Sequence, residues 1–150
     1  SSMSLIVNKK AGLRFEILDT YVAGLELSGA EVKSLRAKHG SLEGARVIVR
    51  GGEAYLVGMT IPPYQVKNTP ESYEPERVRR LLLSKKEIAE LADAESKKGL
   101  TTVPLEVYNM GRYLKVKVAI AKGKGKADKR EDLKRADAKL DMERALRAKR

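Results

Sequence analysis

The sequence contains no cysteine and no tryptophan, and it has one histidine and one phenylalanine. Without cysteine the chain can form no disulfide, no thiolate zinc site and no cysteine nucleophile. Long apolar runs are also missing. Even residues 116–121 are interrupted by Lys117, whereas a bilayer-spanning helix needs ~20 apolar residues. The chain does not open with a basic segment followed by an apolar one, so the sequence predicts a cytoplasmic protein without a membrane partner.

Positive charge is what the chain has in excess. Its 150 residues carry 31 lysines and arginines against 20 acidic residues, a formal net charge of +11. A charge of this size on so short a chain indicates a polyanionic partner, and nucleic acid is the first candidate. The length fits one domain with a hydrophobic core of its own.

Local patterns predict six strands in the first 121 residues. The predicted strands cover residues 14–19, 22–27, 46–50, 53–61, 101–108 and 113–121. The first two are expected to pair, and Gly24 suggests a bend or bulge between them. Gly51 and Gly52 supply the positive φ angles of a tight hairpin turn. In the last strand apolar residues alternate with Lys115 and Lys117, which places both lysines on one exposed face.

Two capping boxes predict two short helices. In one, the Ser28 hydroxyl and the Glu31 carboxylate satisfy backbone N–H groups of the first turn, and Gly40 should end the helix. A second box at residues 84–87 begins a helix that should end at Gly99. Its apolar stripe is expected to consist of Ile88, Leu91 and Ala92. Between the helices, residues 62–75 hold four of the five prolines, which is typical of an irregular loop.

These elements predict a mainly β protein, an OB-like antiparallel β-barrel of about six strands with two or three short helices. The predicted barrel domain covers residues 1–121. Residues 122–150 form a separate basic tail with twelve basic and six acidic side chains and few large apolar ones. The tail has no core of its own, but it is rich in strong helix formers, so we expect it to become helical on a partner surface.

The residue inventory argues against an enzyme. His39, the single histidine, lies at the end of a predicted helix, where it fits a helix-dipole role. The carboxylates lie in capping boxes or beside lysines and arginines, without a paired arrangement on a predicted cleft. The glycine and lysine residues at 122–126 lack the spacing of a nucleotide-binding loop. No catalytic residue, metal site or cofactor is predicted.

Basic residues form clusters that suit phosphate groups, because each such contact releases condensed counterions. The clusters are Lys9 with Lys10; Lys33, Arg36 and Lys38; Arg77, Arg79 and Arg80; and the tail. Six tyrosines and Phe15 are candidates for stacking on unpaired bases, although most of them are expected in the core or at its rim.

Several short segments, taken in order along the chain, resemble one family. Residues 29–36 (GAEVKSLR) are similar to the helix signature of SmpB, the small protein partner of tmRNA in bacterial trans-translation. Further similar segments follow in order at 8–11 (NKKA), 21–24 (YVAG), 52–58 (GEAYLVG), 76–83 (ERVRRLLL), 86–88 (KEI), 121–124 (AKGK) and 128–130 (DKR). Each segment alone is weak, but their order and spacing together are specific for the family.

The resemblance implies a mechanism. The barrel would bind the tRNA-like domain of tmRNA. The tail would enter the decoding centre of 16S rRNA and the empty mRNA channel of a stalled ribosome, where it would fold into a helix. Elongation factor Tu would be a partner through alanyl-tmRNA. Translation would then switch to the tag message.

The basic clusters and the resemblance together give the candidate site residues. The resemblance itself matches Glu31, Lys33, Arg36 and Leu82 on the tmRNA side, and Lys122, Lys124, Asp128, Lys129 and Arg130 on the ribosome side. The predicted tmRNA contacts are Lys9, Lys10, Glu31, Lys33, Arg36, Arg77, Arg79, Arg80 and Leu82. The predicted ribosome contacts are Lys122, Gly123, Lys124, Asp128, Lys129, Arg130, Lys134 and Arg135. As a helix cap, Glu31 also has a complete structural explanation.

Some positions depart from the family pattern. The family often has Glu at the position of Val22, Tyr at Phe15, and Asn or His at Ser84. Many members carry His or Tyr where Ala127 stands, and alanine cannot stack on a base. Either charge and helix formation alone anchor this tail, or another residue takes over the stacking.

Two alternatives remain at this point. One is a generic OB-type RNA-binding or ribosome-associated protein, which would bind rRNA fragments and tmRNA equally well. The other is an enzyme such as a nuclease, which rests only on basicity and scattered carboxylates.

Overall fold

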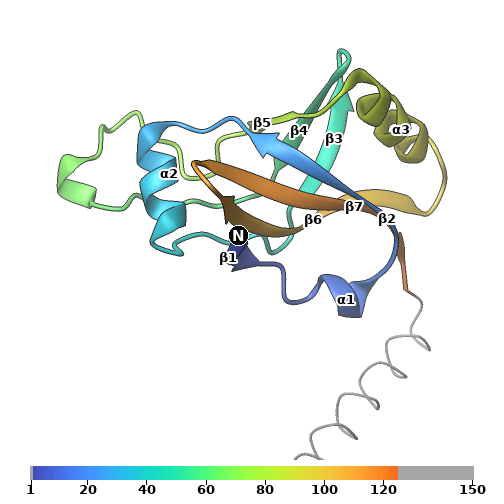
Figure 1. The fold of residues 1–150 in the computed structure, drawn as a ribbon, viewed down its shortest axis with the longest axis horizontal. Helices are drawn as coiled ribbons and strands as arrows, with labels where there is room; N and C mark the ends of the chain where they lie inside the picture. Colours follow the sequence, from blue (N-terminus) through green and yellow to red (C-terminus); the bar gives the residue numbers. More distant parts are fainter. Residues whose placement is uncertain (1, 125–150) are drawn as a thin grey trace, which may run out of the picture.

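The computed structural model describes residues 2–124, which form a β-barrel with helices at its ends (Figure 1). The strands are β1 (Ser2–Val7), β2 (Phe15–Leu25), β3 (Arg46–Arg50), β4 (Glu53–Val57), β5 (Arg79–Leu82), β6 (Leu100–Met110) and β7 (Tyr113–Gly123). The helices are α1 (Ala11–Arg14), α2 (Gly29–Arg36), α3 (Lys85–Glu95) and the 3-10 helix η1 (Val66–Asn68).

Six strands close into a ring in which every pair is antiparallel. The order β6-β3-β4-β5-β2-β7 returns to β6 through the β6–β7 pairing. β1 pairs with residues 106–110 of β6, which follow Thr102, the β6 residue that pairs with β3. The predicted fold class, a mainly β, OB-like antiparallel barrel with short helices, is therefore confirmed. Closing the ring leaves few strand edges unpaired.

The core fills the ring with side chains from alternate positions of the long strands. Along β7, Leu114, Val116, Val118 and Ile120 are buried as their alternation predicts. Tyr21, Ala23 and Leu25 of β2 face inward in the same way. Leu35 from α2 and Leu91 from α3 cover the two open ends of this core. Burying such apolar side chains is the main force that holds the fold together.

Both capping boxes form as predicted. Glu31 N–H donates to Ser28 Oγ at 3.3 Å and Ser28 N–H donates to Glu31 Oε1 at 2.9 Å. The box that opens α3 has the same two bonds. The predicted end of α2 was wrong in detail, because the left-handed residue after the helix is Lys38, with φ 64°, and not Gly40. In α3 the third buried apolar residue is Ala94 and not Ala92.

Two predictions about the strands need correction. Segments 14–19 and 22–27 do not pair with each other, because they belong to the single strand β2, which pairs with β7 along its length. The irregularity in β2 is a bulge between Ile17 and Asp19, so the bend or bulge predicted at Gly24 was placed at the wrong position. The last strand, β7, also extends two residues past its predicted end, through Lys122 and Gly123.

Besides the turn η1, three elements were not predicted: β1, α1 and β5. The hairpin of β3 and β4 was predicted correctly at its turn, with Gly51 and Gly52 at φ 59° and 77°, but β4 ends at Val57 and not at residue 61. The proline-rich segment 62–75 is a loop, as expected, and contains only the turn η1. Within the described residues, no helix is both long enough and apolar enough to cross a bilayer.

Candidate nucleic-acid interface

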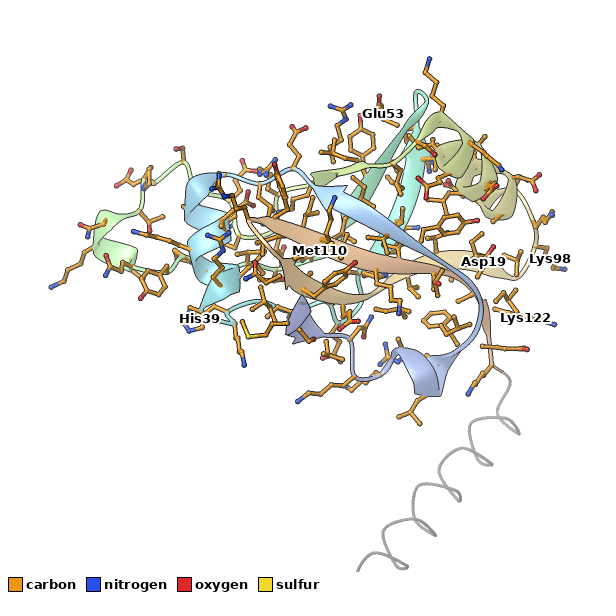
Figure 2. All side chains as sticks on the ribbon, in the orientation of Figure 1. Asp19, His39, Glu53, Lys98, Met110 and Lys122 are labelled. Carbon is orange, nitrogen blue, oxygen red and sulfur yellow. The ribbon has the colours of Figure 1, made fainter. Side chains whose placement is uncertain are left out.

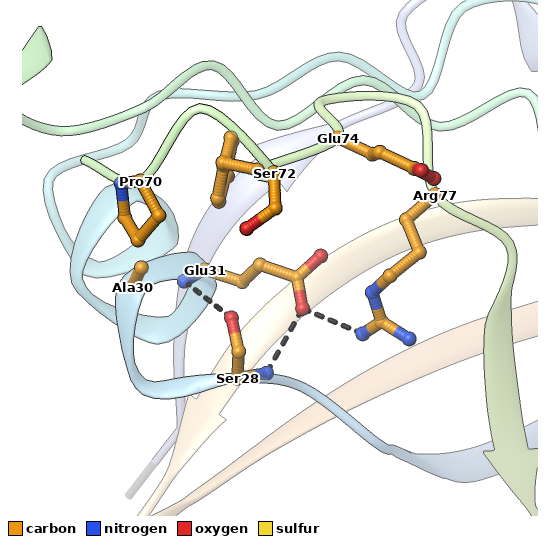
Figure 3. A pocket seen from close by; sticks show the side chains of 8 residues that line it. Ser28, Ala30, Glu31, Pro70, Ser72, Glu74 and Arg77 are labelled. Atoms are coloured by element: carbon orange, nitrogen blue, oxygen red, sulfur yellow. Dashed lines mark hydrogen bonds and ion pairs between the residues drawn. The ribbon is translucent and has the colours of Figure 1, made fainter.

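Glu31 of α2 lies at the centre of a cluster of charges with Arg77, which precedes β5, and Arg79 of β5. Figure 3 shows its bonds to Ser28 and Arg77. Arg77 Nη2 donates to Glu31 Oε1 at 2.6 Å, and Arg79 Nε donates to Oε2 at 2.8 Å. The Ser28 amide of the capping box shares Oε1 with Arg77. Burial raises the pKa of Glu31, but the hydrogen bonds from Arg77, Ser28 and Arg79 together hold that pKa below its usual value.

Arg79 is part of the scaffold and does not lie on the surface. Its side chain is 0% exposed, and its guanidinium also donates to Met59 O at 2.6 Å and to Pro75 O at 2.9 Å. A side chain so enclosed has no surface to offer an RNA phosphate. We therefore assign Arg79 to the ion pair with Glu31, which holds the 62–78 loop against α2, and not to the direct RNA contacts. Glu31, 1% exposed, has the same structural role.

Arg77 and Arg80 lie at the surface beside this cluster. The Arg77 side chain is 40% exposed although one of its nitrogens bonds Glu31. Arg80 points outward from β5 and lies between two carboxylates, 3.1 Å from Glu53 and 3.4 Å from Glu26. These carboxylates offset part of the positive charge of Arg80.

Leu82 is the centre of an exposed patch that we call the strand face. The strand face is the outer surface of β5, β2, β7 and β6 and consists of Arg80, Leu82, Val22, Lys115, Lys117 and Tyr108. Leu82 and Val22 are 49% and 48% exposed. A Cβ on Gly24 would lie 3.1 Å from the Leu82 Cβ, so the glycine gives Leu82 room to lie across β2. Leu82 and Val22 therefore give the strand face exposed aliphatic surface beside its charged residues.

The two lysines of the strand face flank its apolar centre. The backbone register places Lys115 opposite Gly24 and Lys117 opposite Val22. Both side chains are partly exposed, and in residues 2–124 neither forms an ion pair with a carboxylate. Glu106, opposite Lys117, accepts instead from the Ser4 hydroxyl at 2.9 Å. The site prediction missed both lysines and Val22, although the alternation in β7 was the signal for the lysines.

The remaining predicted contacts of the body separate into two groups. Lys33 and Arg36 lie on the exposed side of α2, where Arg36 Nη2 donates to Arg112 O at 3.0 Å. Lys9 and Lys10 are exposed beside the 40–43 segment, where Lys10 pairs with Glu43 at 2.7 Å.

The predicted tail residues begin at the end of β7. Lys122 and Gly123 are exposed strand residues, and Lys124 Nζ donates to Gly12 O of α1 at 2.8 Å. Figure 2 places Lys122 and His39, which follows α2, toward opposite ends of the molecule. The tail therefore leaves the barrel far from α2. Asp128, Lys129, Arg130, Lys134, Arg135, Ala127 and the predicted tail helix lie outside the described residues.

The aromatic residues divide between core and surface. Tyr21 is buried, and its hydroxyl donates to Glu90 at 2.8 Å. Tyr73 donates to Ile61 O at 2.8 Å. Tyr113 and Tyr64 are 71% and 45% exposed, so they are available for stacking.

In the part of the chain that the structure describes, no three His, Asp or Glu side chains gather as a metal site would require.

Comparisons with known proteins agree with this geometry. A family model described as "SmpB protein" matches residues 5–148. A relative named SsrA-binding protein from Gloeothece citriformis is 44% identical over 140 residues, covering 93% of this chain and 90% of its own. SsrA-binding proteins from Elusimicrobium minutum and Salinispora arenicola are 48% and 49% identical, covering 95% and 92% of this chain and 90% and 86% of theirs.

A solved structure has the same fold. It is described as "tmRNA-SmpB: a journey to the center of the bacterial ribosome", and its chain is 41% identical with a TM-score of 0.69. The match covers 87% of this chain and 94% of that one. The family match extends over almost the whole sequence and the structural match over most of the chain, so the chain belongs to the SmpB family.

Proposed function

We propose that this protein binds the tRNA-like domain of tmRNA and delivers tmRNA to stalled ribosomes for trans-translation. Membership of the SmpB family carries this conclusion. The geometry supports it, because the strand face combines an apolar centre at Leu82 and Val22 with two lysines that form no ion pair with a carboxylate in the described residues. Aliphatic side chains can pack on exposed bases while lysines bind the phosphates beside them.

Within this proposal the two parts of the chain have different tasks. The barrel, residues 1–121, binds tmRNA through the strand face, the exposed side of α2, and the Lys9, Lys10 and Arg77 side chains. The tail, residues 122–150, enters the decoding centre and the empty mRNA channel and reports that no message lies downstream. The origin of the tail at the end of β7, far from α2, supports this division. RNA bound near α2 would leave the tail accessible to the ribosome.

Elongation factor Tu is the further partner that we infer, through the alanyl-tmRNA that the protein accompanies. Because the partners are tmRNA and the ribosome, we place the protein in the cytoplasm. The SmpB family is a family of RNA-binding proteins, and we propose no catalytic step. RNA that stays intact during long incubation with the protein and Mg²⁺ would support this view, and Mg²⁺-dependent cleavage would contradict it.

Sequencing the RNA that copurifies with the protein from its own cells tests the proposed function. We expect tmRNA to be strongly enriched over its share of total RNA. A mixture that follows the abundance of ribosomal and transfer RNA would contradict the proposal and favour a generic RNA-binding protein.

A further inference from the structure

A groove between α2 and the proline-rich loop includes Lys33 from the exposed side of α2, but the proposed function gives no role to the loop residues that line it. We call it the loop groove, and it is lined by Gly29, Ala30, Lys33, Tyr64, Gln65, Asn68 and Thr69. Its volume is about 370 Å³, within the range of roughly 300–1,000 Å³ that is typical of ligand pockets. The two small residues at the start of α2 leave space on one side, and η1 with its flanking residues forms the other wall.

Bonds outside the loop groove anchor the two ends of the loop that forms one of its walls. At the start of the loop, the Ser34 hydroxyl of α2 donates to Pro62 O at 2.7 Å. At its end, Tyr73 donates to Ile61 O at 2.8 Å and Arg79 to Pro75 O at 2.9 Å. The Glu31 ion pairs therefore fix the loop as well as α2. Anchored ends restrict the loop and so reduce the conformational entropy that is lost when a ligand enters.

The side chains that line the loop groove suit a nucleotide. Tyr64 is 45% exposed, and its ring lies 6.2 Å from that of His39 at an interplanar angle of 32°. Asn68 Nδ2 donates to Gln65 Oε1 at 2.9 Å, which leaves the Asn68 oxygen and the Gln65 amide nitrogen for a base edge. Lys33 is the charged residue of the lining, and no described carboxylate forms an ion pair with it.

The neighbouring hollow is less suitable for a nucleotide. It is lined by Glu31 and Glu74 together with Arg77, Ser28, Ala30, Pro70, Ser72 and Tyr73 (Figure 3). Arg77 of this hollow is already paired with Glu31, and Glu74 adds a second carboxylate, whereas the loop groove has a lysine and no carboxylate in its lining. The charge therefore directs a phosphate toward Lys33.

We propose that the loop groove binds one unpaired nucleotide of an RNA, its base stacked on Tyr64, its edge bonded by Asn68 and Gln65, and its phosphate paired with Lys33. Every base has a π-face, so a tyrosine accepts any unpaired base, and the amides add selectivity. This inference rests on the proposed function, and the nucleotide can belong to tmRNA or to ribosomal RNA.

Paired titrations of the full chain test the proposal, one with tmRNA and one with stalled ribosomes. Tyr64→Leu removes the ring, and we expect affinity for one of the two RNAs to fall roughly 5-fold to 100-fold. Tyr64→Phe keeps the ring and should bind like the wild type. Val66→Ala is the matched control, because Val66 lies in the same turn, is 79% exposed and does not line the groove. Unchanged thermal melting of all three variants shows that the fold is intact.

Each outcome has a definite meaning. Loss confined to tmRNA assigns the nucleotide to tmRNA, and loss confined to ribosomes assigns it to ribosomal RNA. Equal binding of Tyr64→Leu and wild type in both titrations overturns the proposal, as does an equal loss for Tyr64→Phe. If the wild type shows no preference for tmRNA, the proposed function fails, while the ribosome titration still tests the loop groove.

Discussion

Glu31 bonds three partners that come from different parts of the chain. Its carboxylate caps α2 through the Ser28 amide and pairs with Arg77 and with the fully buried Arg79. Removing one partner of a buried ion pair leaves an uncompensated charge inside the protein. At the residue scale, the fold near the candidate interface therefore depends on this carboxylate more than on any contact that it could make with RNA.

Replacing the Glu31 carboxylate by an amide should separate its charge from its capping bond. In Glu31→Gln the side-chain amide oxygen could still accept the Ser28 N–H, but Arg79 would lose its counter-charge, so we expect the free energy of unfolding to fall by about 3–5 kcal/mol. Glu87→Gln is the matched control, because Glu87 closes the same box at the surface without an arginine partner in the described structure, and it should lose less than about 1 kcal/mol. Denaturant unfolding of both variants measures the difference. Similar losses would show that Glu31 acts only as a cap.

The lowered pKa of Glu31 should also appear in the pH dependence of stability. An unfolded glutamate titrates near pH ~4.3, and the folded carboxyl has a pKa below its ordinary value. Its stabilisation is therefore complete above about pH 4.3 and is lost as the pH falls through the folded pKa. We expect the free energy of unfolding of the wild type to decrease more steeply below this pH than that of Glu31→Gln. Parallel curves for the two proteins would contradict the assignment.

At the scale of elements, the strand face depends on the register between β5, β2 and β7. That register places Leu82, Gly24 and Lys115 in one row and Val22 and Lys117 in the next. A shift of one residue would turn these side chains inward. The long pairing of β2 with β7, which the bulge near Ile17 interrupts once, therefore determines which residues RNA can reach.

Neutralising both lysines of the strand face should weaken tmRNA binding without unfolding the barrel. For the Lys115→Gln, Lys117→Gln double variant we expect lower affinity. The slope of the logarithm of affinity against the logarithm of salt concentration should become shallower by the amount expected for the loss of about two phosphate contacts. Thermal melting should not change, because neither lysine is in an ion pair in the described structure. The control is Lys85→Gln with Lys98→Gln, which removes the same charge at the first residue of α3 and in the turn after its end. An equal loss in the control would mean that only net charge matters.

Local signals in the sequence predicted local structure well. Both capping boxes, the hairpin at Gly51 and the alternation in β7 depend on residues close together in the chain, and all of them were confirmed. β5 was missed because it is four residues long and begins with an arginine. Arg79, its first residue, is buried because it pairs with Glu31, 48 residues earlier in the chain. No local sequence pattern indicates that pairing.

In the candidate site, too, features that depend on neighbouring residues were predicted and features that depend on distant residues were missed. Leu82, Lys33 and Arg36 are exposed, as an RNA contact requires. Arg79 was grouped with Arg77 and Arg80 because the three are close in the sequence, but only a neighbour from α2 determines that Arg79 points inward. Val22 joins the strand face through the pairing of β2 with β7, which the predicted hairpin between segments 14–19 and 22–27 would have prevented.

At the scale of the whole molecule, the barrel and the tail should separate into two activities. Because β7 runs through Gly123, we would end the truncated chain after Lys124. The truncated protein should bind tmRNA within a few-fold of the wild type and melt at a similar temperature, but tagging of stalled peptides in a reconstituted translation system should be lost. Complete loss of RNA affinity would show that this division is wrong.

The central claim is that this protein selects a tRNA-shaped RNA and does not bind RNA through charge alone. A competition titration at fixed salt tests it most directly, with labelled tmRNA displaced either by unlabelled tmRNA or by an unrelated RNA duplex of equal length. Charge alone attracts both competitors to a similar extent. We expect the duplex to require a concentration at least about 100-fold higher than tmRNA for half displacement. Equal displacement by the two RNAs would contradict the account.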